Sequence, residues 1–461
     1  MMQLSTIAKA VNGKLLGEDV EIQSIGTDSR AIISNQLFVA IKGENFDGNQ
    51  FAEAAIGQGA AAVLVSHAQT LARPAVVVGD TRLALGQLAQ FWRNQFEMPL
   101  IAITGSNGKT TTKEMLSAIL VAATKDLTKV HATVGNLNND IGMPLTLLKM
   151  RKEHAYAVIE MGMNHLGEID YLTKIAQPTV VLIINAGTAH IGELGSRENI
   201  AKAKGEIFNG LSENGIAVIN ADDAFFGYWQ ALTIGKKVLT FSLNKVADVS
   251  AKYQEIEGLS HIELTTPTGK INFKLNVLGK HNIANAVAAT AAAVALGICN
   301  QNIADGLQNM QAVHSRLQRK AGLNGVLLID DTYNANPDSM KAAIDVLAAM
   351  DGARIFVMGD MGELGEDAAT MHAEIGLYAK QNGVKNLLAF GALSIHAANA
   401  FGAGAQHFSA LEDVIINTKK LMQTHTTVLV KGSRFMKMER VVEPLTQQNL
   451  EKSLMEDAQC Y

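Results

Sequence analysis

A glycine-rich turn between an apolar strand pattern and a helical pattern constrains this chain more than any other segment. Residues 100–103 read Leu-Ile-Ala-Ile, residues 104–113 read Thr-Gly-Ser-Asn-Gly-Lys-Thr-Thr-Thr-Lys, and a helical pattern follows from Glu114. In such a turn, successive backbone N–H groups point into a concavity, and the start of the helix adds positive potential. The segment therefore predicts a parallel α/β sheet with a phosphate-binding loop at the end of one strand.

The spacing of this loop is shorter than usual. The common pattern G-x-x-x-x-G-K-[ST] has its first glycine where this chain has Ile103, and the sequence is instead Gly105-x-x-Gly108-Lys109-Thr110. We expect Lys109 to place a charge on the distal phosphates and Thr110 to offer its hydroxyl to Mg²⁺. The alternative is a glycine-rich turn with a surface lysine. The loop residues expected to bind the nucleotide are Gly105, Ser106, Asn107, Gly108, Lys109, Thr110 and Thr111.

Strand and helix patterns alternate along most of the chain and divide it into three parts. At 461 residues the chain is too long for one core. Residues 1–82 mix short strand patterns with a helical pattern and predict a small α/β domain. Residues 83–314 predict a mostly parallel sheet with crossover helices, and residues 315–461 restart the alternation as a Rossmann-like sheet.

Two polar residues stand at predicted strand ends in the central part, and a third lies on the helix that follows. Glu160 ends a strand pattern and is a candidate Mg²⁺ ligand, because ligands bind beyond the carboxyl ends of parallel strands. His190 follows the next strand pattern, and Lys204 lies on a helix between Ala203 and Gly205. A lone histidine is usually structural and a helical lysine usually faces solvent. A buried lysine, however, has a depressed pKa and can react.

Polar residues also gather at two later positions. His281, Asn282 and Asn285 share one face of an Ala-rich helix, where amides could read a purine edge; N-capping by Asn282 is the alternative. Further polar residues follow strand patterns in the third part or stand at its junction with the second, where cations suit an anionic group. These are Arg316, Asp331, Tyr333, Asn334, Asn336, Lys431 and Arg434.

Composition and charge exclude several classes of protein. The net charge of −5, with both signs dispersed, argues against nucleic acid as the main partner. Cys299 and Cys460 fit neither a disulfide framework nor a metal site. The first residues show no secretory signal, and no apolar run approaches the roughly 20 residues needed to span a bilayer. We therefore expect a cytoplasmic protein.

The motifs together resemble those of the Mur ligase family, ATP-dependent enzymes that form amide bonds in peptidoglycan precursor synthesis. The motifs that carry the resemblance are Gly105-x-x-Gly108-Lys109-Thr110-Thr111, Glu160-Met161-Gly162, Asn185-Ala186-Gly187-x-x-His190, Ala203-Lys204 and His281-Asn282-x-x-Asn285. Further segments are similar to the branch of the family that uses D-alanyl-D-alanine. They are Thr27-Asp28-Ser29-Arg30, Gly43-Glu44-x-x-Asp47-Gly48, the segment from Gly135 to Leu145, Asp330 to Pro337, and Gly359-Asp360-Met361-x-Glu363-Leu364-Gly365. Asn49 stands where this branch commonly has histidine, and Thr332 where it has serine.

The resemblance implies a reaction and its participants. ATP would activate the terminal carboxylate of UDP-N-acetylmuramoyl-tripeptide as an acyl phosphate, which the amine of D-alanyl-D-alanine then attacks. Two Mg²⁺ sites are implied, the first held by Thr110 and Glu160, the second by His190 and a Lys204 carbamylated by CO₂. A monomer is expected.

By the same resemblance, Lys109, Glu160, His190 and Lys204 would be catalytic, and His281, Asn282 and Asn285 would lie near the adenine. Arg316 and Asp331 would lie near the ribose and phosphates. Residues implied in binding UDP are Ser29, Arg30, Asn138 and Asn139, and those implied for the dipeptide or acyl-phosphate region are Tyr333, Asn334, Asn336, Lys431 and Arg434.

Two other kinds of protein compete with this interpretation. A different ligase of the same family, or a folylpolyglutamate synthase, would share the short phosphate loop. The segment from Asp331 to Pro337 and the separate first domain favour the D-alanyl-D-alanine branch. A non-catalytic ATP-dependent switch would need the loop and one carboxylate but would have no use for His190 and Lys204 together.

Overall fold

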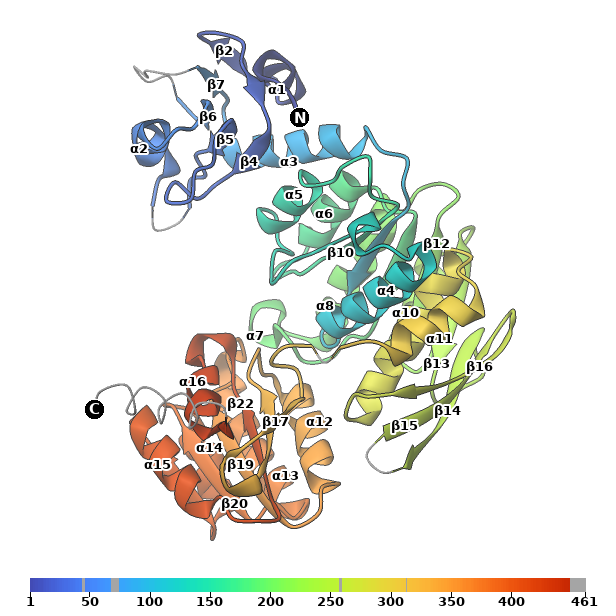
Figure 1. Cartoon of the computed structure of the whole chain (residues 1–461), viewed down its shortest axis with the longest axis vertical. Coiled ribbons are helices and arrows are strands. Elements are labelled where there is room, and N and C mark those ends of the chain that lie inside the picture. The colour runs from blue at the N-terminus through green and yellow to red at the C-terminus, as the bar shows by residue number, and fades with distance from the viewer. Residues whose placement is uncertain (44–45, 68–73, 257–258, 312, 448–461) are drawn as a thin grey trace, which may run out of the picture.

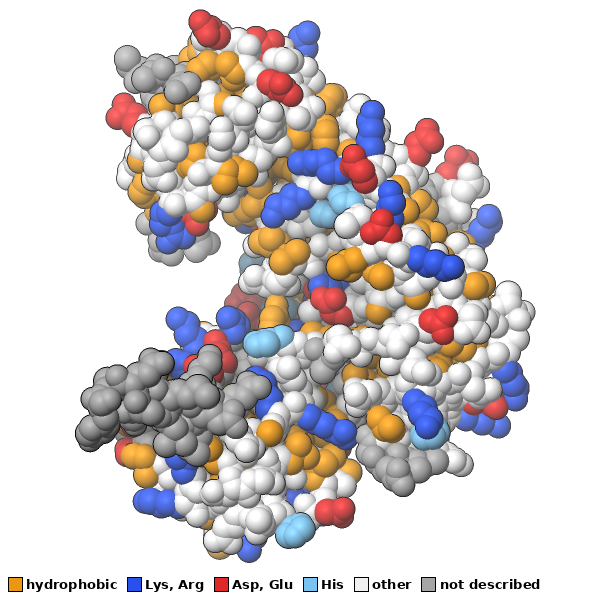
Figure 2. Space-filling view, viewed as in Figure 1, with side chains coloured by type: hydrophobic (Ala, Val, Ile, Leu, Met, Phe, Trp, Pro, Cys, Tyr) orange, Lys and Arg blue, Asp and Glu red, His pale blue; other side chains and the backbone are white. Residues whose placement is uncertain are grey.

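The computed structural model shows three α/β parts that follow one another along the chain (Figure 1). It describes residues 1–43, 46–67, 74–256, 259–311 and 313–447. Glu44 of the first-part motif and residues 448–461 of the predicted third domain lie outside the described residues. Figure 2 shows the surface hollowed between the N-terminal and C-terminal parts, with the central part forming the back of the hollow.

The N-terminal part contains a five-stranded sheet in the order β2-β7-β6-β5-β4, parallel except where β2 meets β7, and a separate antiparallel pair, β1-β3. Its elements are β1 (Met2–Gln3), α1 (Leu4–Ala10), β2 (Lys14–Leu16), β3 (Glu21–Ile22), β4 (Ser24–Gly26), β5 (Gln36–Val39), α2 (Ala52–Gly57), β6 (Ala62–Val65), β7 (Ala75–Val77) and α3 (Thr81–Arg93). Buried Asn49 bonds to Asp47 and to the backbone of Ser66 within this part.

The central part is built on a nine-stranded sheet in the order β16-β15-β14-β13-β12-β11-β8-β10-β9, parallel from β14 to β9. Its strands are β8 (Leu100–Thr104), β9 (Val130–Ala132), β10 (Tyr156–Glu160), β11 (Val180–Ile183), β12 (Ile216–Asn220), β13 (Lys237–Ser242), β14 (Val249–Ile256), β15 (Leu259–Thr266) and β16 (Gly269–Leu275). Its helices are α4 (Lys109–Thr124), α5 (Gly142–Leu147), α6 (Glu168–Ala176), α7 (Ile191–Leu194), α8 (Arg197–Gly205), α9 (Phe226–Leu232), α10 (Lys280–Ala295) and α11 (Asn300–Gln308).

The C-terminal part has a six-stranded sheet in the order β17-β18-β22-β19-β20-β21. Its elements are β17 (Gln318–Ala321), β18 (Leu327–Asp331), α12 (Pro337–Ala348), β19 (Ala353–Gly359), α13 (Ala368–Gln381), β20 (Asn386–Phe390), α14 (Ser394–Phe401), β21 (Ala405–Phe408), α15 (Leu411–Leu421), β22 (Thr426–Lys431) and α16 (Glu439–Val442). The predicted parallel sheet is confirmed, with β17 added as an antiparallel edge strand.

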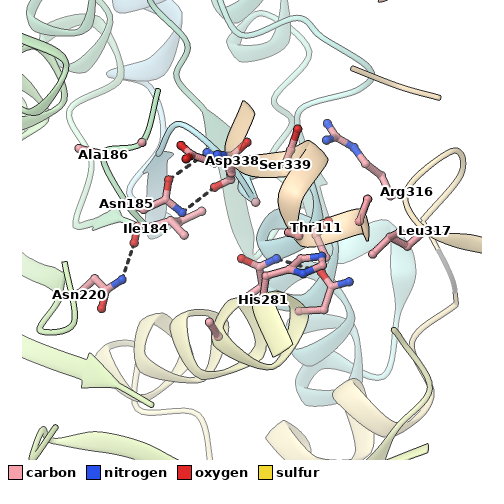
Figure 3. Close-up of a pocket in the computed structure, with 18 of the residues that line it drawn as sticks. Thr111, Ile184, Asn185, Ala186, Asn220, His281, Arg316, Leu317, Asp338 and Ser339 are labelled. Atoms are coloured by element: carbon pink, nitrogen blue, oxygen red, sulfur yellow. Dashed lines mark hydrogen bonds between the residues drawn. The ribbon is translucent and has the colours of Figure 1, made fainter. Parts of the chain in front are cut away.

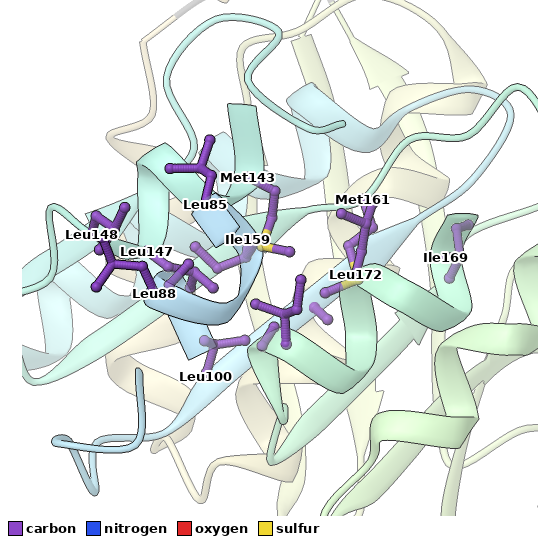
Figure 4. Close-up of a cluster of buried hydrophobic side chains, with 14 of the residues drawn as sticks. Leu85, Leu88, Leu100, Met143, Leu147, Leu148, Ile159, Met161, Ile169 and Leu172 are labelled. Carbon is purple, nitrogen blue, oxygen red and sulfur yellow. The ribbon is translucent and has the colours of Figure 1, made fainter. Parts of the chain in front are cut away.

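Apolar clusters hold helices on both faces of the central sheet. On one face, α4, α10 and α11 pack on the strands through side chains such as Ile103, Leu116 and Ile283. On the other face, α3, α5 and α6 pack through Leu88, Leu147 and Leu172 (Figure 4). This second cluster continues into the N-terminal sheet, so α3 contributes to both parts. No described helix is long and apolar enough to cross a membrane.

Candidate functional site

The phosphate loop is fixed between β8 and the first turn of α4. The backbone N–H groups of Ser106 and Asn107 donate to the carbonyl and side-chain oxygens of Asn185, at 3.1 and 3.0 Å. Gly108 has φ +83°, and a Cβ there would collide with the Asn285 carboxamide, so glycine is required. Helix α4 begins at Lys109, earlier than the pattern from Glu114 indicated, so the loop runs directly into a helix N-terminus.

The Lys109 side chain folds back onto the phosphate loop. Its Nζ donates to the Gly105 carbonyl at 2.6 Å. Burial lowers the pKa of Lys109, and the nearby carboxylate of Glu160 opposes that shift. An anion in the loop would favour the charged form of Lys109, because a buried cation needs a partner.

Glu160 presents a buried carboxylate with one unused oxygen. Strands β8 and β10 are neighbours, with Glu160 opposite Ile103, so the carboxylate lies at the same sheet edge as the phosphate loop. Its side chain is 1% exposed; Oε2 accepts from Thr110 Oγ1 at 3.5 Å, and Lys113 Nζ lies 4.0 Å from Oε1. Among the described residues Oε1 has no hydrogen-bond partner. A buried carboxylate oxygen without a hydrogen bond, beside a hydroxyl, fits a hard cation such as Mg²⁺.

His190 and Lys204 differ in their surroundings. His190 lines the larger cavity described below, has φ +64° and places Nδ1 2.8 Å from Glu363 Oε2 of the C-terminal part. This contact lowers the pKa of Glu363. Lys204 is 1% exposed, with Nζ 3.8 Å from Met163 Sδ. Burial, and next the charge of Lys109, lower the pKa of Lys204 well below its ordinary value. The alternative of a solvated helical lysine is therefore wrong.

A cavity of about 340 Å³ lies between α10, the phosphate loop and the C-terminal part (Figure 3). His281, Asn282 and Asn285 line it from α10, and Thr111 lines it from α4. Asn282 is not the N-cap that the alternative proposed, because α10 begins at Lys280 with Gly279 as its cap. Asn282 Nδ2 donates instead to the Leu278 carbonyl at 2.7 Å, and Asn285 Nδ2 donates to Asn282 Oδ1 at 3.0 Å. The mixed polar and apolar walls suit a flat base.

A second, larger cavity of about 680 Å³ lies on the other side of the loop. The sequence-predicted residues that line it are Ser106, Asn107, Gly108, Lys109, Thr110, Asn138, Asn139, Glu160, His190, Arg316, Tyr333, Asn334, Asn336 and Arg434. The predicted residues that line the smaller cavity are Asn107, Gly108, Thr111, His281, Asn282, Asn285, Arg316, Asp331 and Lys431. Two regions more than a hundred residues apart thus form one continuous site around Asn107, Gly108 and Arg316.

Residues of the C-terminal part reach the loop directly. Arg316 stacks its guanidinium 4.0 Å from the Tyr333 ring centre and donates to Thr110 Oγ1 at 3.4 Å. Asn336 Nδ2 donates to Asn107 Oδ1 at 2.7 Å. Behind them, buried Lys431 donates to Asp331 Oδ2 at 2.6 Å. These contacts dock the C-terminal part on the nucleotide loop.

Four predicted residues lie outside the linings of both cavities. Gly105 accepts from Lys109, and Lys204 is buried. Ser29 and Arg30 belong to the N-terminal part, where the Arg30 side chain is 87% exposed and pairs with Asp28. Their predicted role in binding UDP therefore depends on surfaces that the two cavities do not include.

Sequence reasoning missed three residues that the structure places at the site. Asn185 fixes the loop, Asp338 Oδ2 accepts from the Thr188 N–H at 2.7 Å, and Glu363 meets His190. Asn185 and Glu363 each stand within a motif that was recognised, just beyond β11 and β19, so their strand-end position was an available signal. Asp338 sits inside the first turn of α12 and carried no such signal.

Comparisons with known proteins bear on all three parts. The chain matches the Mur ligase family, catalytic domain over residues 21–93, the Mur ligase middle domain over residues 103–293, and the Mur ligase, glutamate ligase domain over residues 315–434. A relative from Escherichia coli (strain K12), called UDP-N-acetylmuramoyl-tripeptide--D-alanyl-D-alanine ligase, is 43% identical over 96% of this chain and 98% of its own.

Solved structures agree with the sequence matches. A crystal structure of MurF from Acinetobacter baumannii has a TM-score of 0.89 at 38% identity, covering 95% of this chain and 97% of that one. MurF ligase from Thermotoga maritima in complex with ADP has a TM-score of 0.83 at 28% identity, covering 94% and 98%.

Proposed function

The chain belongs to the Mur ligase family, and from this premise we propose that it is an ATP-dependent ligase joining D-alanyl-D-alanine to UDP-N-acetylmuramoyl-tripeptide. Its products are the UDP-N-acetylmuramoyl-pentapeptide, ADP and phosphate. The observation that carries the proposal is the meeting of the phosphate loop, buried Glu160 and Arg316 of the C-terminal part around one continuous site.

The chemistry requires two anions to react. A carboxylate oxygen of the tripeptide attacks the γ-phosphorus of ATP, the bond from that phosphorus to the bridging oxygen breaks, and ADP leaves. The amine of D-alanyl-D-alanine then attacks the acyl carbon, loses a proton and expels phosphate. Positioning and charge neutralisation are the tasks of the protein. Lys109, in the loop itself, and Arg316, from the C-terminal part, supply positive charge to the phosphates.

Thr110 and Glu160 are the residues that would hold Mg²⁺ with the nucleotide. A bound Mg²⁺ would neutralise charge on the phosphates and align them. Among the described residues, no group of three His, Cys, Asp or Glu side chains is arranged to hold a metal by itself. This agrees with Mg²⁺, which usually takes one or two carboxylates and completes its shell with phosphates and water.

Lys204 is proposed to carry a carbamate. A neutral amine adds to CO₂ through its nitrogen lone pair and releases a proton, and burial of Lys204 favours the neutral amine. No carboxylate of the described residues forms an ion pair with Lys204, and the charge of Asp223, which favours the cation, is outweighed by burial and by the charge of Lys109. The carbamate would turn the lysine into an anionic oxygen ligand that serves a second Mg²⁺ together with His190.

The remaining assignments follow the two cavities. The smaller cavity would take the adenosine, with His281, Asn282 and Asn285 at the base and Asp331 toward the ribose. Tyr333, Asn334, Asn336 and Arg434 would face the dipeptide and the acyl phosphate, with Lys431 behind them holding Asp331. Asn138 and Asn139, with Ser29 and Arg30 on the N-terminal part, would bind the UDP-sugar. A monomer in the cytoplasm completes the proposal.

Phosphate release from ATP tests this function. The assay combines the protein with Mg²⁺-ATP, UDP-N-acetylmuramoyl-tripeptides carrying diaminopimelate or lysine, and either D-alanyl-D-alanine or a single amino acid. We expect release only when a UDP-tripeptide and the dipeptide are both present. Release driven equally well by a single amino acid would identify a different ligase, and release without any peptide would identify an ATP-dependent switch.

The carbamate has its own test. Lys204→Ala should abolish ligation, and an added short-chain carboxylic acid should partly restore it because it supplies the missing oxygen ligand. Lys202→Ala, on the exposed side of the same helix, is the matched control. Full activity of the untreated Lys204→Ala protein would refute the carbamate.

A further inference from the structure

A glutamate of the C-terminal part contacts a histidine of the central part at the edge of the larger cavity. Glu363 Oε2 lies 2.8 Å from His190 Nδ1, although the ring is not turned for a regular hydrogen bond. The backbone joins the two parts at the same place, because the Gly192 N–H donates to the Glu363 carbonyl at 3.0 Å. Helix α7, which His190 precedes, is thus held against the loop after β19.

The loop that carries Glu363 is anchored firmly in the C-terminal part. The Met361 N–H donates to buried His372 at 2.9 Å, and the Gly362 N–H donates to Ser433 Oγ at 2.8 Å. The Asp360 carboxylate accepts from the Ser394 N–H at 2.7 Å. Glu363 itself has φ +61°, a conformation that this anchoring sustains. The backbone that carries Glu363 is therefore fixed, while its side chain remains 52% exposed and lies against His190.

The contact selects one form of the histidine ring. A carboxylate oxygen only accepts hydrogen bonds, and a lone pair on Nδ1 at 2.8 Å from it would be repelled, so the short distance favours the tautomer of neutral His190 that carries its proton on Nδ1. The lone pair then resides on Nε2, which is left to a ligand. A histidine that binds a metal almost always donates its other ring N–H to a carboxylate, carbonyl or water, which fixes the tautomer and the ring orientation.

We propose that Glu363 is a positioning residue that orients His190 as a metal ligand, and that it does so only when the C-terminal part is docked. The inference rests on the proposed metal role of His190. The proposed role of Glu363 explains why the motif from Gly359 to Gly365, far from the phosphate loop in the chain, lies beside the site in the fold. The second metal position would then form together with domain docking rather than before it.

Manganese binding to the full chain tests the inference. Mn²⁺ affinity is measured by electron paramagnetic resonance with a non-hydrolysable ATP analogue and UDP-N-acetylmuramoyl-tripeptide present. We expect Glu363→Leu to weaken one Mn²⁺ site roughly tenfold to a hundredfold, as loss of such a partner does elsewhere. Glu363→Gln, whose side-chain oxygen still accepts from Nδ1, should lose less. Glu366→Gln changes an exposed glutamate of the same loop and should bind Mn²⁺ as the unchanged protein does.

Small-angle X-ray scattering on the same samples separates orientation from simple docking. We expect equal radii of gyration for the unchanged protein and both Glu363 variants. An expanded Glu363→Leu protein, equal losses in the Leu and Gln variants, or unchanged Mn²⁺ affinity would each overturn the inference. The His190→Ala variant tests the premise that His190 binds a metal. Unchanged Mn²⁺ binding in His190→Ala refutes that metal role. Weakened Mn²⁺ binding in His190→Ala together with unchanged binding in Glu363→Leu refutes only the role of Glu363.

Discussion

Two stacked histidines beside α5 should make the central part sensitive to mild acid. His131 on β9 and His154 before β10 have ring centres 4.9 Å apart. His131 Nε2 lies 2.7 Å from the Thr146 carbonyl of α5, and His154 Nδ1 accepts from the Arg151 N–H at 3.0 Å. Burial, the largest cause, lowers the pKa of His131 to about 4. Both rings are therefore held neutral in the folded protein.

The direction and size of the effect follow from this pKa. An unfolded chain protonates His131 near pH 6.5, whereas the folded chain resists protonation until about pH 4. The folded state therefore loses nothing above pH 6.5 and loses stability progressively as the pH falls toward 4. The difference amounts to about 2 kcal/mol at pH 5 and about 3 kcal/mol below pH 4.

Hydrogen exchange of the amides in α5 and β9 measures this loss. His131→Gln keeps an N–H donor for Thr146 but cannot titrate, and comparing the two proteins at each pH cancels the intrinsic pH dependence of exchange. We expect the unchanged protein to lose roughly thirtyfold in protection relative to His131→Gln between pH 7 and pH 5. Exposed His165→Gln serves as the control. The same ratio of protection at both pH values would refute the reasoning.

Three further substitutions probe the C-terminal part and its docking. Lys431→Met leaves Asp331 as a buried charge without its cation and should lower the stability of β18 and β22 by about 3–5 kcal/mol. Hydrogen exchange measures this loss, and unchanged exchange would contradict the ion pair. Gly376→Ala should lower the melting temperature, because the added Cβ collides with a backbone carbonyl of α14. The cost of this collision outweighs the roughly 1 kcal/mol gained in helix propensity, and a higher melting temperature would contradict this expectation. Asp338→Ala removes two hydrogen bonds to Thr188, at 2.7 and 2.9 Å, and should raise the radius of gyration of the protein. Addition of Mg²⁺-ATP should reverse this increase. An unchanged radius of gyration would show that these bonds do not hold the domains together.

Local patterns predicted the central framework well. The mostly parallel sheet with crossover helices that was predicted over residues 83–314 is the arrangement that the structure shows, because the apolar spacing of each strand and helix is contained in its own segment. The phosphate loop and the strand-end position of Glu160 were predicted for the same reason. Helix α1, at Leu4–Ala10, was missed, since seven residues carry too short a period to stand out.

Local sequence patterns could not predict the contacts between segments that lie far apart in the chain. Glu363 stood in a recognised motif, but only the docking of two domains places it beside His190. The place of Lys431 after a strand predicted contact with an anionic group, and the family resemblance implied the dipeptide or acyl-phosphate region. Its ion pair with Asp331 depends on the pairing of β18 with β22. The depth at which Lys204 is buried likewise depends on tertiary packing and not on its neighbours in the chain.

Helix α3 packs in a single hydrophobic cluster that serves two parts of the chain. Its side chains Leu85 and Leu88 pack in the cluster that joins the N-terminal sheet to α5 and α6 of the central part. The predicted border at residues 82 and 83 falls inside this helix. In an exchange of the first domain between related ligases, a crossover at this border would divide α3 between two parents. A crossover beyond Arg93 would transfer the whole helix and leave only its contacts with α5 and α6 to be matched. The unit that recombination can transfer is larger than the unit that the sheet defines.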